Sequence, residues 1–144
     1  MNEIQKKPIY SKLAEIYDHI MSDVDYAYWA EYIDDLLHQH HPEPTAITEL
    51  SCGTASLTLE LSKLGDYDLQ ACDASPDMVL VGSKKLDTLA QPIPCFEASF
   101  DDLLAIREQD ALISVFDSVN YLLQPGEIEH FFHEAAKCLT VNGL

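Results

Sequence analysis

The stretch Thr45–Leu64, TAITELSCGTASLTLELSKL, contains the local patterns that decide the fold. Its first part, Ala46–Leu50, is short and rich in β-forming residues, with apolar side chains at alternate positions, and it predicts a strand. From Ser56 to Leu64 the apolar residues recur at helical spacing. Between them, Ser51–Ala55 is a turn made only of small residues. A strand, a tight turn and a helix in this order are typical of the opening of a doubly wound α/β domain, where the turn and the helix N-terminus form the floor of a ligand site.

The turn differs from the dinucleotide fingerprint G-x-G-x-x-G. Only Gly53 is a glycine, and Glu49 precedes the turn at a place where a pyrophosphate would be repelled. Both features count against NAD or FAD, whereas a ligand with an ammonium or sulfonium group would tolerate Glu49. Asp73 follows Gly53 by 20 residues, after the next predicted strand, Tyr67–Cys72. An acidic side chain at that place can accept hydrogen bonds from both ribose hydroxyls.

Four motifs follow one another along the chain. The first combines Glu49 with Ser51, Gly53 and Ala55, and the second is Asp73-Ala74-Ser75 with Met78 behind it. The third is Ala98–Leu103 and the fourth is Asp110–Leu122. They are preceded by a Tyr-Asp-x-x-Met segment at Tyr17–Met21 and an Asp-Tyr-x-x-Trp segment at Asp25–Trp29. On these motifs and their spacing, the chain resembles the class I S-adenosylmethionine-dependent methyltransferases, in particular a small single-domain group with this N-terminus.

The resemblance implies a Rossmann-like three-layer α/β sandwich. Its parallel sheet would have the order 3-2-1-4 in this chain, as the first part of the family order 3-2-1-4-5-7-6. Residues 1–44 would form an N-terminal helical cap or lid, and residues 45–144 the cofactor-binding core, truncated before strand 5. The sequence thus predicts the N-terminal part of a longer enzyme, and this part alone is expected to be inactive.

The resemblance also assigns residues to the cofactor, S-adenosylmethionine. Glu49 would hold the methionine amino group, and the turn amides of Gly53, Thr54 and Ala55 its carboxylate. Asp73 would bind the ribose. The remaining expected cofactor contacts are Tyr17, Ser51, Ala74, Met78, Ser99, Phe100 and Phe116. Three departures from the family pattern are notable, because Ser51 and Ala55 stand at glycine positions and Ser99 at that of an acidic residue beside the adenine.

The residues that face the methyl acceptor are expected after the fourth strand. They are Asp117, Asn120 and Tyr121. Methyl transfer from a sulfonium needs mainly in-line alignment in a dry pocket, and such positioning can supply ~7–11 kcal/mol. If the acceptor must lose a proton, Asp117 is the first candidate base; the alternative is that Asp117 only holds the turn after the strand.

Lid candidates precede the first strand. Tyr17, and with less support Tyr10 and Tyr26, could cover the cofactor; the alternative is that the two N-terminal helices, predicted at Ser11–Met21 and Trp29–His40, only cap the sheet. The other expected elements are a helix from Pro76 to about Leu89, strands Cys95–Ala98 and Ala111–Phe116, and a helix Glu127–Leu139. The apolar residues of this last helix are expected to be buried; they are Ile128, Phe131, Phe132, Ala135, Ala136 and Leu139.

The composition of the chain limits the kinds of molecule that it is expected to bind. The chain has 144 residues and a formal net charge of −17, which would repel a nucleic-acid backbone, so a small-molecule methyl acceptor is expected. The sequence has no apolar run long enough to span a bilayer and no visible secretion signal. Its four cysteines are not paired as C-x-x-C and are expected to be reduced, which indicates a cytoplasmic protein. The histidine tract His38–His41 fits a helix end better than a metal site, and no metal is predicted.

Two functions from other classes remain open. A nucleotide-cofactor oxidoreductase is disfavoured by the glycine count and by Glu49. A non-catalytic cofactor-binding module is allowed by the departures at Ser51, Ala55 and Ser99. The sequence also predicts that strand Ala111–Phe116 is an apolar sheet edge, which would be covered by a second copy or by the C-terminal half of the protein.

Overall fold

The computed structural model describes residues 12–144, which form a four-stranded sheet between two layers of helices. The strands are β1 (Ala46–Leu50), β2 (Asp68–Asp73), β3 (Cys95–Glu97) and β4 (Ala111–Ile113). They lie in the order β3-β2-β1-β4 and every neighbouring pair is parallel. The predicted strand order is therefore confirmed. Tyr10 and Ser11, the first residue of the predicted N-terminal helix, lie outside the described residues.

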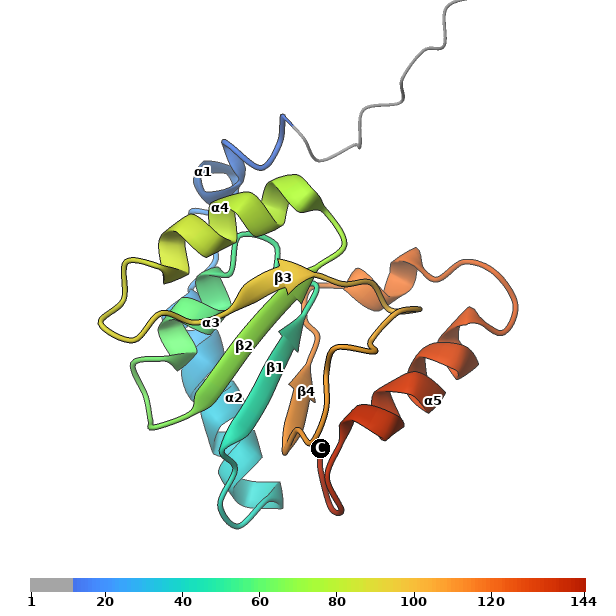
Figure 1. Cartoon of the computed structure of the whole chain (residues 1–144). Helices are drawn as coiled ribbons and strands as arrows, with labels where there is room; N and C mark the ends of the chain where they lie inside the picture. Colours follow the sequence, from blue (N-terminus) through green and yellow to red (C-terminus); the bar gives the residue numbers. More distant parts are fainter. Residues whose placement is uncertain (1–11) are drawn as a thin grey trace, which may run out of the picture.

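The helices divide between the two faces of the sheet. They are α1 (Tyr17–Ile20), α2 (Tyr26–His40), α3 (Ser56–Leu61), α4 (Pro76–Leu86) and α5 (Glu127–Cys138), with a 3₁₀ turn η1 (Ser118–Tyr121). Figure 1 shows α2, α3 and α4 on one face and α5 on the other. Along β1, Ile47 faces the cluster formed with α2 and α3, while Leu50 faces the cluster formed with α5. This alternation is what a strand buried on both faces requires, and it confirms the three-layer Rossmann-like sandwich.

Two helix starts follow directly from side-chain caps. The Asp25 carboxylate accepts a hydrogen bond from the Tyr28 amide at 3.0 Å, so α2 begins at Tyr26, earlier than predicted. The Ser75 hydroxyl accepts from the Met78 amide at 3.4 Å and Pro76 is the first helical residue of α4, as predicted.

The fourth strand and its continuation differ from the prediction. β4 ends at Ile113 and does not extend to Phe116, because Phe116 and Asp117 both adopt left-handed backbone conformations, with φ of 57° and 64°. Two such residues in a row turn the chain out of the sheet. Asp117 is a residue type that tolerates this conformation, and its place in the turn agrees with the alternative role given to it above, whereas Phe116 gives no local signal for the turn.

The helix ends and helix faces also depart from the predictions. Only Tyr17–Ile20 of the first predicted helix is helical, and Ile16 and Ile20 are exposed. α3 ends at Leu61 and α4 at Leu86, each before the predicted end. On α5, Phe131, Ala135 and Cys138 are buried, while four residues predicted to be buried are not. These are Ile128, Phe132, Ala136 and Leu139.

The outer edge of β4 carries the last residue of the chain. The Leu112 amide donates to the Leu144 carbonyl at 2.9 Å, and the Leu144 amide donates to the Asp110 carbonyl at 2.9 Å. The expectation of a bare edge is therefore corrected for this part of β4. Leu144 occupies the place beside strand four where a fifth strand would pair.

The core contains one buried carboxyl group. Glu49, in β1, is 3% exposed and accepts a hydrogen bond from the hydroxyl of Thr58, which is fully buried in α3. Burial raises the pKa of Glu49 from 4.5 to about 8, against the opposing effect of the Thr58 hydrogen bonds. The protonated form of Glu49 is therefore favoured by folding.

We expect Glu49 to make the protein less stable as the pH rises. Because its pKa is raised on folding, its contribution to stability is complete below pH 4.5, declines as the pH rises and is lost at about pH 8. Glu49→Gln should reduce the loss of unfolding free energy between pH 5 and pH 8 by roughly 1–4 kcal/mol. Urea denaturation at both pH values measures this. Glu97→Gln, the same change at an exposed strand residue, should retain the wild-type pH dependence; equal slopes for all three proteins would contradict the account.

Candidate functional site

A cavity of about 650 Å³ lies at the carboxyl ends of the strands. In an open parallel sheet, ligands bind at this edge, at the point where the strand order reverses. Here that point lies between β1 and β4. Its wall comes from the segments that follow all four strands. The predicted site residues on the wall are Tyr17, Ser51, Gly53, Asp73, Ala74, Met78, Ser99, Phe100, Phe116 and Tyr121.

The turn after β1 has left-handed backbone at alternate residues. Ser51, Gly53 and Ala55 have φ of 53°, 56° and 60°. These are the three positions that carry glycines in the family motif, and a left-handed conformation is the physical reason for glycine there. Ser51 and Ala55 adopt the same conformation despite their side chains, so the turn keeps its shape.

Asp73 connects the turns that follow β1 and β2. Its Oδ2 accepts a hydrogen bond from the Gly53 amide at 2.8 Å, and its Oδ1 accepts one from the Ser75 amide at 2.8 Å. A carboxylate held by two backbone N–H groups has a fixed orientation, and each oxygen retains a lone pair. Asp73 also lines the cavity, so it can accept hydrogen bonds from a ligand without moving.

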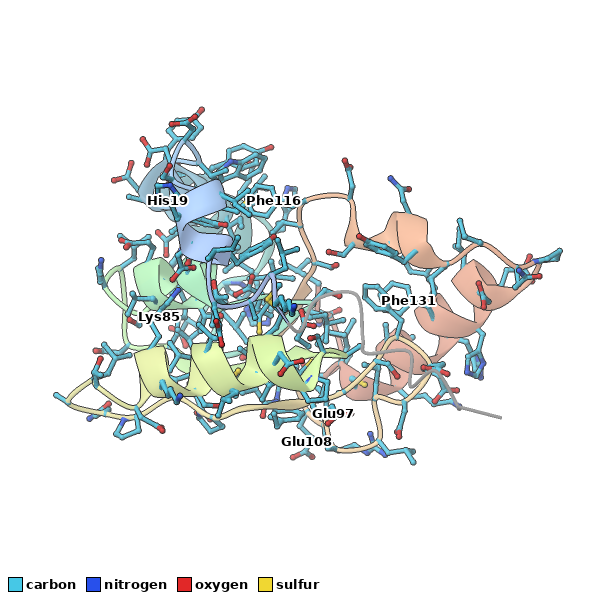
Figure 2. All side chains as sticks on the ribbon, turned by 90° about the horizontal axis from the view of Figure 1, so that it is seen from above. His19, Lys85, Glu97, Glu108, Phe116 and Phe131 are labelled. Atoms are coloured by element: carbon cyan, nitrogen blue, oxygen red, sulfur yellow. The ribbon has the colours of Figure 1, made fainter. Side chains whose placement is uncertain are left out.

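Aromatic rings form the side of the cavity nearest the N-terminal helices. A Cβ at Gly53 would lie 3.4 Å from the Tyr17 ring, an ordinary van der Waals distance, so the ring lies directly against the turn. Phe116 makes edge contacts with Tyr26 and Trp29 of α2, at centroid distances of 5.7 and 5.3 Å. Seen from above the sheet, Phe116 lies near the N-terminal helices and Phe131 lies on α5 (Figure 2). Burial and the nearby Asp73 carboxylate raise the pKa of Tyr17, so its hydroxyl is a donor at neutral pH.

The segment after β3 provides a second carboxylate. The Ser99 hydroxyl donates to Asp101 Oδ1 at 2.5 Å, and this hydrogen bond lowers the pKa of Asp101. Phe100 packs against Phe131 of α5 at a centroid distance of 4.6 Å. Ser99 occupies the position at which the family pattern has an acidic residue. Its hydroxyl is hydrogen-bonded to an acidic residue, Asp101, two positions later in the chain.

Five predicted site residues are not on the cavity wall. Glu49, Thr54 and Ala55 are buried beneath it, and Asp117 and Asn120 are exposed outside it. The Gly53 amide donates to Asp73 and the Ala55 amide donates to the Cys52 carbonyl. A ligand carboxylate at these two amides would have to share or exchange those bonds.

The structure adds wall residues that sequence reasoning missed. Ser75 and Pro76 cap and begin α4, and Asp101 follows Ser99 and Phe100; all three also line the cavity. The others come from the chain after β4, where no sequence signal distinguishes a cavity-facing residue from a surface one. They are Ser118, Leu122, Glu127 and His130.

The charge of the cavity favours a cationic ligand. Its wall carries Asp73, Asp101 and Glu127, and among the described residues that line it there is no lysine or arginine. A pyrophosphate would meet carboxylates without a compensating cation, whereas an ammonium or sulfonium group would be attracted.

Other ligand classes find little support in the described part of the chain. Within residues 12–144, no group of three or more His, Cys, Asp or Glu side chains is placed to hold a metal ion. None of the helices in this range has both the length and the apolar character needed to cross a membrane.

Comparison with known proteins gives the family. Residues 47–143 match the methyltransferase domain family. A curated relative from Bacillus subtilis (strain 168), named "Putative methyltransferase YqeM", is 28% identical over 137 residues, which are 94% of this chain and 53% of the relative. The chain thus spans about half the length of the curated relatives it matches.

Solved structures show the same fold. An S-adenosylmethionine-dependent methyltransferase from Clostridium acetobutylicum is 26% identical, with a TM-score of 0.79 over 94% of this chain and 55% of that one. Streptomyces venezuelae DesVI is 25% identical, with a TM-score of 0.79 over 91% of this chain and 54% of that one. With the match to the domain family over residues 47–143, the chain belongs to the class I S-adenosylmethionine-dependent methyltransferases.

Proposed function

We propose that this chain is the cofactor-binding part of an enzyme that transfers a methyl group from S-adenosylmethionine to a small-molecule acceptor. The observation that carries the proposal is the Asp73 carboxylate, fixed by the Gly53 and Ser75 amides on the wall of an acidic cavity. When bound, the cofactor supplies a methyl group that its sulfonium has already activated. The residues of the chain have to hold the donor, exclude water and align the acceptor.

In this proposal the cavity residues divide by the part of the cofactor they contact. Asp73 accepts hydrogen bonds from the ribose hydroxyls, with Ala74 and Met78 beside it. Ser99 and Phe100 border the adenine. Tyr17 and Phe116 cover the cofactor from the side of the N-terminal helices, and Ser51 and Gly53 form the floor.

Glu49 is assigned to the methionine amino group, acting from below the turn. It does not line the cavity, so the contact would pass through a water molecule or require a small shift of the turn. An ammonium group nearby would favour the charged form of Glu49, whose pKa is raised by burial. Thr54 and Ala55 would support the turn from the same side.

The acceptor side is assigned to the segment after β4. Tyr121 lines the cavity, while Asp117 and Asn120 lie next to it on η1 and its start. A cavity of about 650 Å³ and a chain with a net charge of −17 both suit a small acceptor better than a nucleic acid. A cytoplasmic location remains part of the proposal, and so does a division into a cap of residues 1–44 and a core of residues 45–144.

The two rival functions are weaker. A nucleotide-cofactor oxidoreductase would need a pyrophosphate site, and the acidic wall opposes one. A non-catalytic binding module remains the second candidate, and only a transfer assay separates it from an enzyme.

Asp73→Ala should weaken binding of S-adenosylhomocysteine by roughly 1–3 kcal/mol, because the ribose hydroxyls would lose a charged acceptor. Isothermal titration calorimetry measures the affinity, and the unfolding free energy is measured in parallel because Asp73 also holds two turns. Asp66→Ala, the same change in the exposed turn just before β2, is the control and should bind as the wild type does. An unchanged affinity for Asp73→Ala would remove Asp73 from the site.

Glu49→Gln should discriminate between ligands. S-adenosylmethionine carries the ammonium group and adenosine does not, so the substitution should weaken the first by roughly tenfold and the second much less. Titrations of both ligands into both proteins test this. Equal losses would show that Glu49 acts through the fold and not through the ligand.

We expect another polypeptide segment to pair with the outer edge of β4. Leu144 covers only its first residues, so we expect association either with a second copy or with the C-terminal half supplied as a separate chain. Sedimentation of the 144-residue chain, alone and with the C-terminal half of a longer homologue, gives the mass. A monomer that transfers methyl groups with full activity on its own would contradict the proposal.

A further inference from the structure

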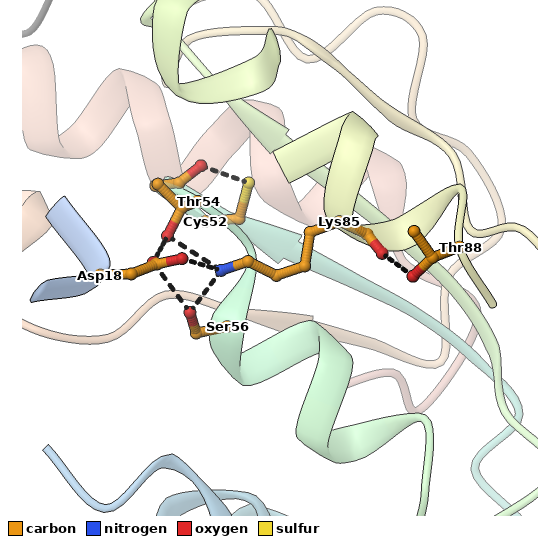
Figure 3. A network of polar contacts seen from close by, with 7 residues as sticks. Asp18, Cys52, Thr54, Ser56, Lys85 and Thr88 are labelled. Carbon is orange, nitrogen blue, oxygen red and sulfur yellow. Dashed lines mark hydrogen bonds and ion pairs between the residues drawn. The ribbon is translucent and has the colours of Figure 1, made fainter. Parts of the chain in front are cut away.

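A polar network of four residues joins three segments that are distant in the sequence. The Lys85 ammonium, in the last turn of α4, lies 2.8 Å from Asp18 Oδ2 in α1. It also donates to the Ser56 hydroxyl at 2.8 Å and to the Thr54 hydroxyl at 3.3 Å. Both hydroxyls in turn donate to Asp18 Oδ1, at 2.5 Å from Thr54 and 3.3 Å from Ser56 (Figure 3).

The network removes the charge of Lys85 largely from water, whereas the Asp18 side chain is 51% exposed. The Lys85 side chain is only 19% exposed, and Asp18 is the only carboxylate among the described residues with which it forms an ion pair. Burial would raise the pKa of Asp18, but the hydrogen bonds from Lys85, Thr54 and Ser56 outweigh this and lower it. If α1 moved away, Lys85 would keep its hydroxyl partners but lose its counter-ion, which opposes the movement.

α1 buries little apolar surface of its own. The helix has four residues, none of which is buried, and Ile16 at its N-terminal cap and Ile20 at its last position are more than half exposed. A helix of one turn is not stable by itself. Ala14, before the helix, is the nearest buried side chain on this segment. Besides the Tyr17 ring, which lies against the turn at Gly53, the ion pair and hydrogen bonds of Asp18 attach α1 to the domain.

The same network reaches both sides of the cavity. Tyr17, next to Asp18, lines the cavity wall, and Thr54 follows Gly53 in the turn that forms its floor. We propose that Asp18 and Lys85 are positioning residues that hold Tyr17 over the cavity and thereby set the rate at which the nucleoside ligand leaves. The second part of this inference rests on the proposed function.

The hydroxyl groups make the inference testable by reversing the charges. A hydroxyl can donate or accept, so Thr54 and Ser56 can bond to an acid or an amine at either end of the pair. Asp18→Lys combined with Lys85→Asp should therefore rebuild the network with the opposite polarity. A merely steric role of the two side chains would not be restored in this way.

The experiment compares Lys85→Met, Lys84→Met and the charge-reversed double variant with the wild type. Methionine keeps most of the apolar stem of lysine but removes the charge. Lys84, the exposed neighbour on α4, is the matched control. Hydrogen exchange of the ligand-free chain reports on residues 12–24, where the amides of Ile20 and Met21 bond within the helix. Stopped-flow measurement gives the rate of S-adenosylhomocysteine release.

We expect Lys85→Met to accelerate exchange in residues 12–24 and ligand release, each by roughly three- to tenfold. Exchange in β1 should not change, Lys84→Met should behave as the wild type, and the charge-reversed pair should recover most of both effects. Unchanged exchange in residues 12–24 overturns the inference. Faster exchange with unchanged release also overturns it, because the network would then be structural only.

Two further outcomes are decided by the same data. If Lys85→Met also accelerates hydrogen exchange in β1, the charge-reversed double variant decides whether the inference holds. Slow release of S-adenosylhomocysteine from this variant supports the inference, and fast release overturns it. If the wild type does not bind S-adenosylhomocysteine, the proposed function fails. The attachment of α1 is then still decided by the exchange of residues 12–24.

Discussion

The site depends on the carboxylate of Asp73. Its two oxygens accept the amides of Gly53 and Ser75, and so it fixes the turns after β1 and β2 relative to each other. The Cys52 amide adds a bond to the Cys72 carbonyl at 2.9 Å, which continues the pairing of the two strands into the turns. Parallel strands bring these turns to one edge, and the carboxylate converts that edge into a ligand wall of defined shape.

Acidic groups surround this wall, and none of the described residues that line it is a lysine or arginine. The Lys85 ammonium group forms an ion pair with Asp18 and donates hydrogen bonds to two hydroxyls. Lys85 does not line the cavity. Glu49 adds a carboxyl group beneath the turn, where burial favours its protonated form. The arrangement attracts a positively charged ligand. A pyrophosphate would be repelled, as the single glycine of the turn, Gly53, and the preceding Glu49 already indicated in the sequence.

Much of the core could be predicted from the sequence, because it depends on patterns that are local. β1 has the predicted bounds, and Ser75-Pro76 starts α4 where a cap followed by proline requires it. The site was harder to predict, because distant segments build it. No local pattern shows that Phe116 and Asp117 turn the chain out of the sheet, or that His130 of α5 reaches the cavity. Helical spacing on α5 identifies an apolar face but does not say that Phe132 remains exposed.

The most direct test of the central claim is the choice of ligand by the wild-type chain. Calorimetric titrations with S-adenosylmethionine, S-adenosylhomocysteine and NAD compare two nucleosides, which carry no phosphate, with a dinucleotide that contains a pyrophosphate. The account predicts that the first two bind and that NAD binds at least tenfold more weakly, because its phosphates meet the acidic wall. Binding of NAD as tight as that of S-adenosylhomocysteine, or no binding of either sulfur nucleoside, would contradict it.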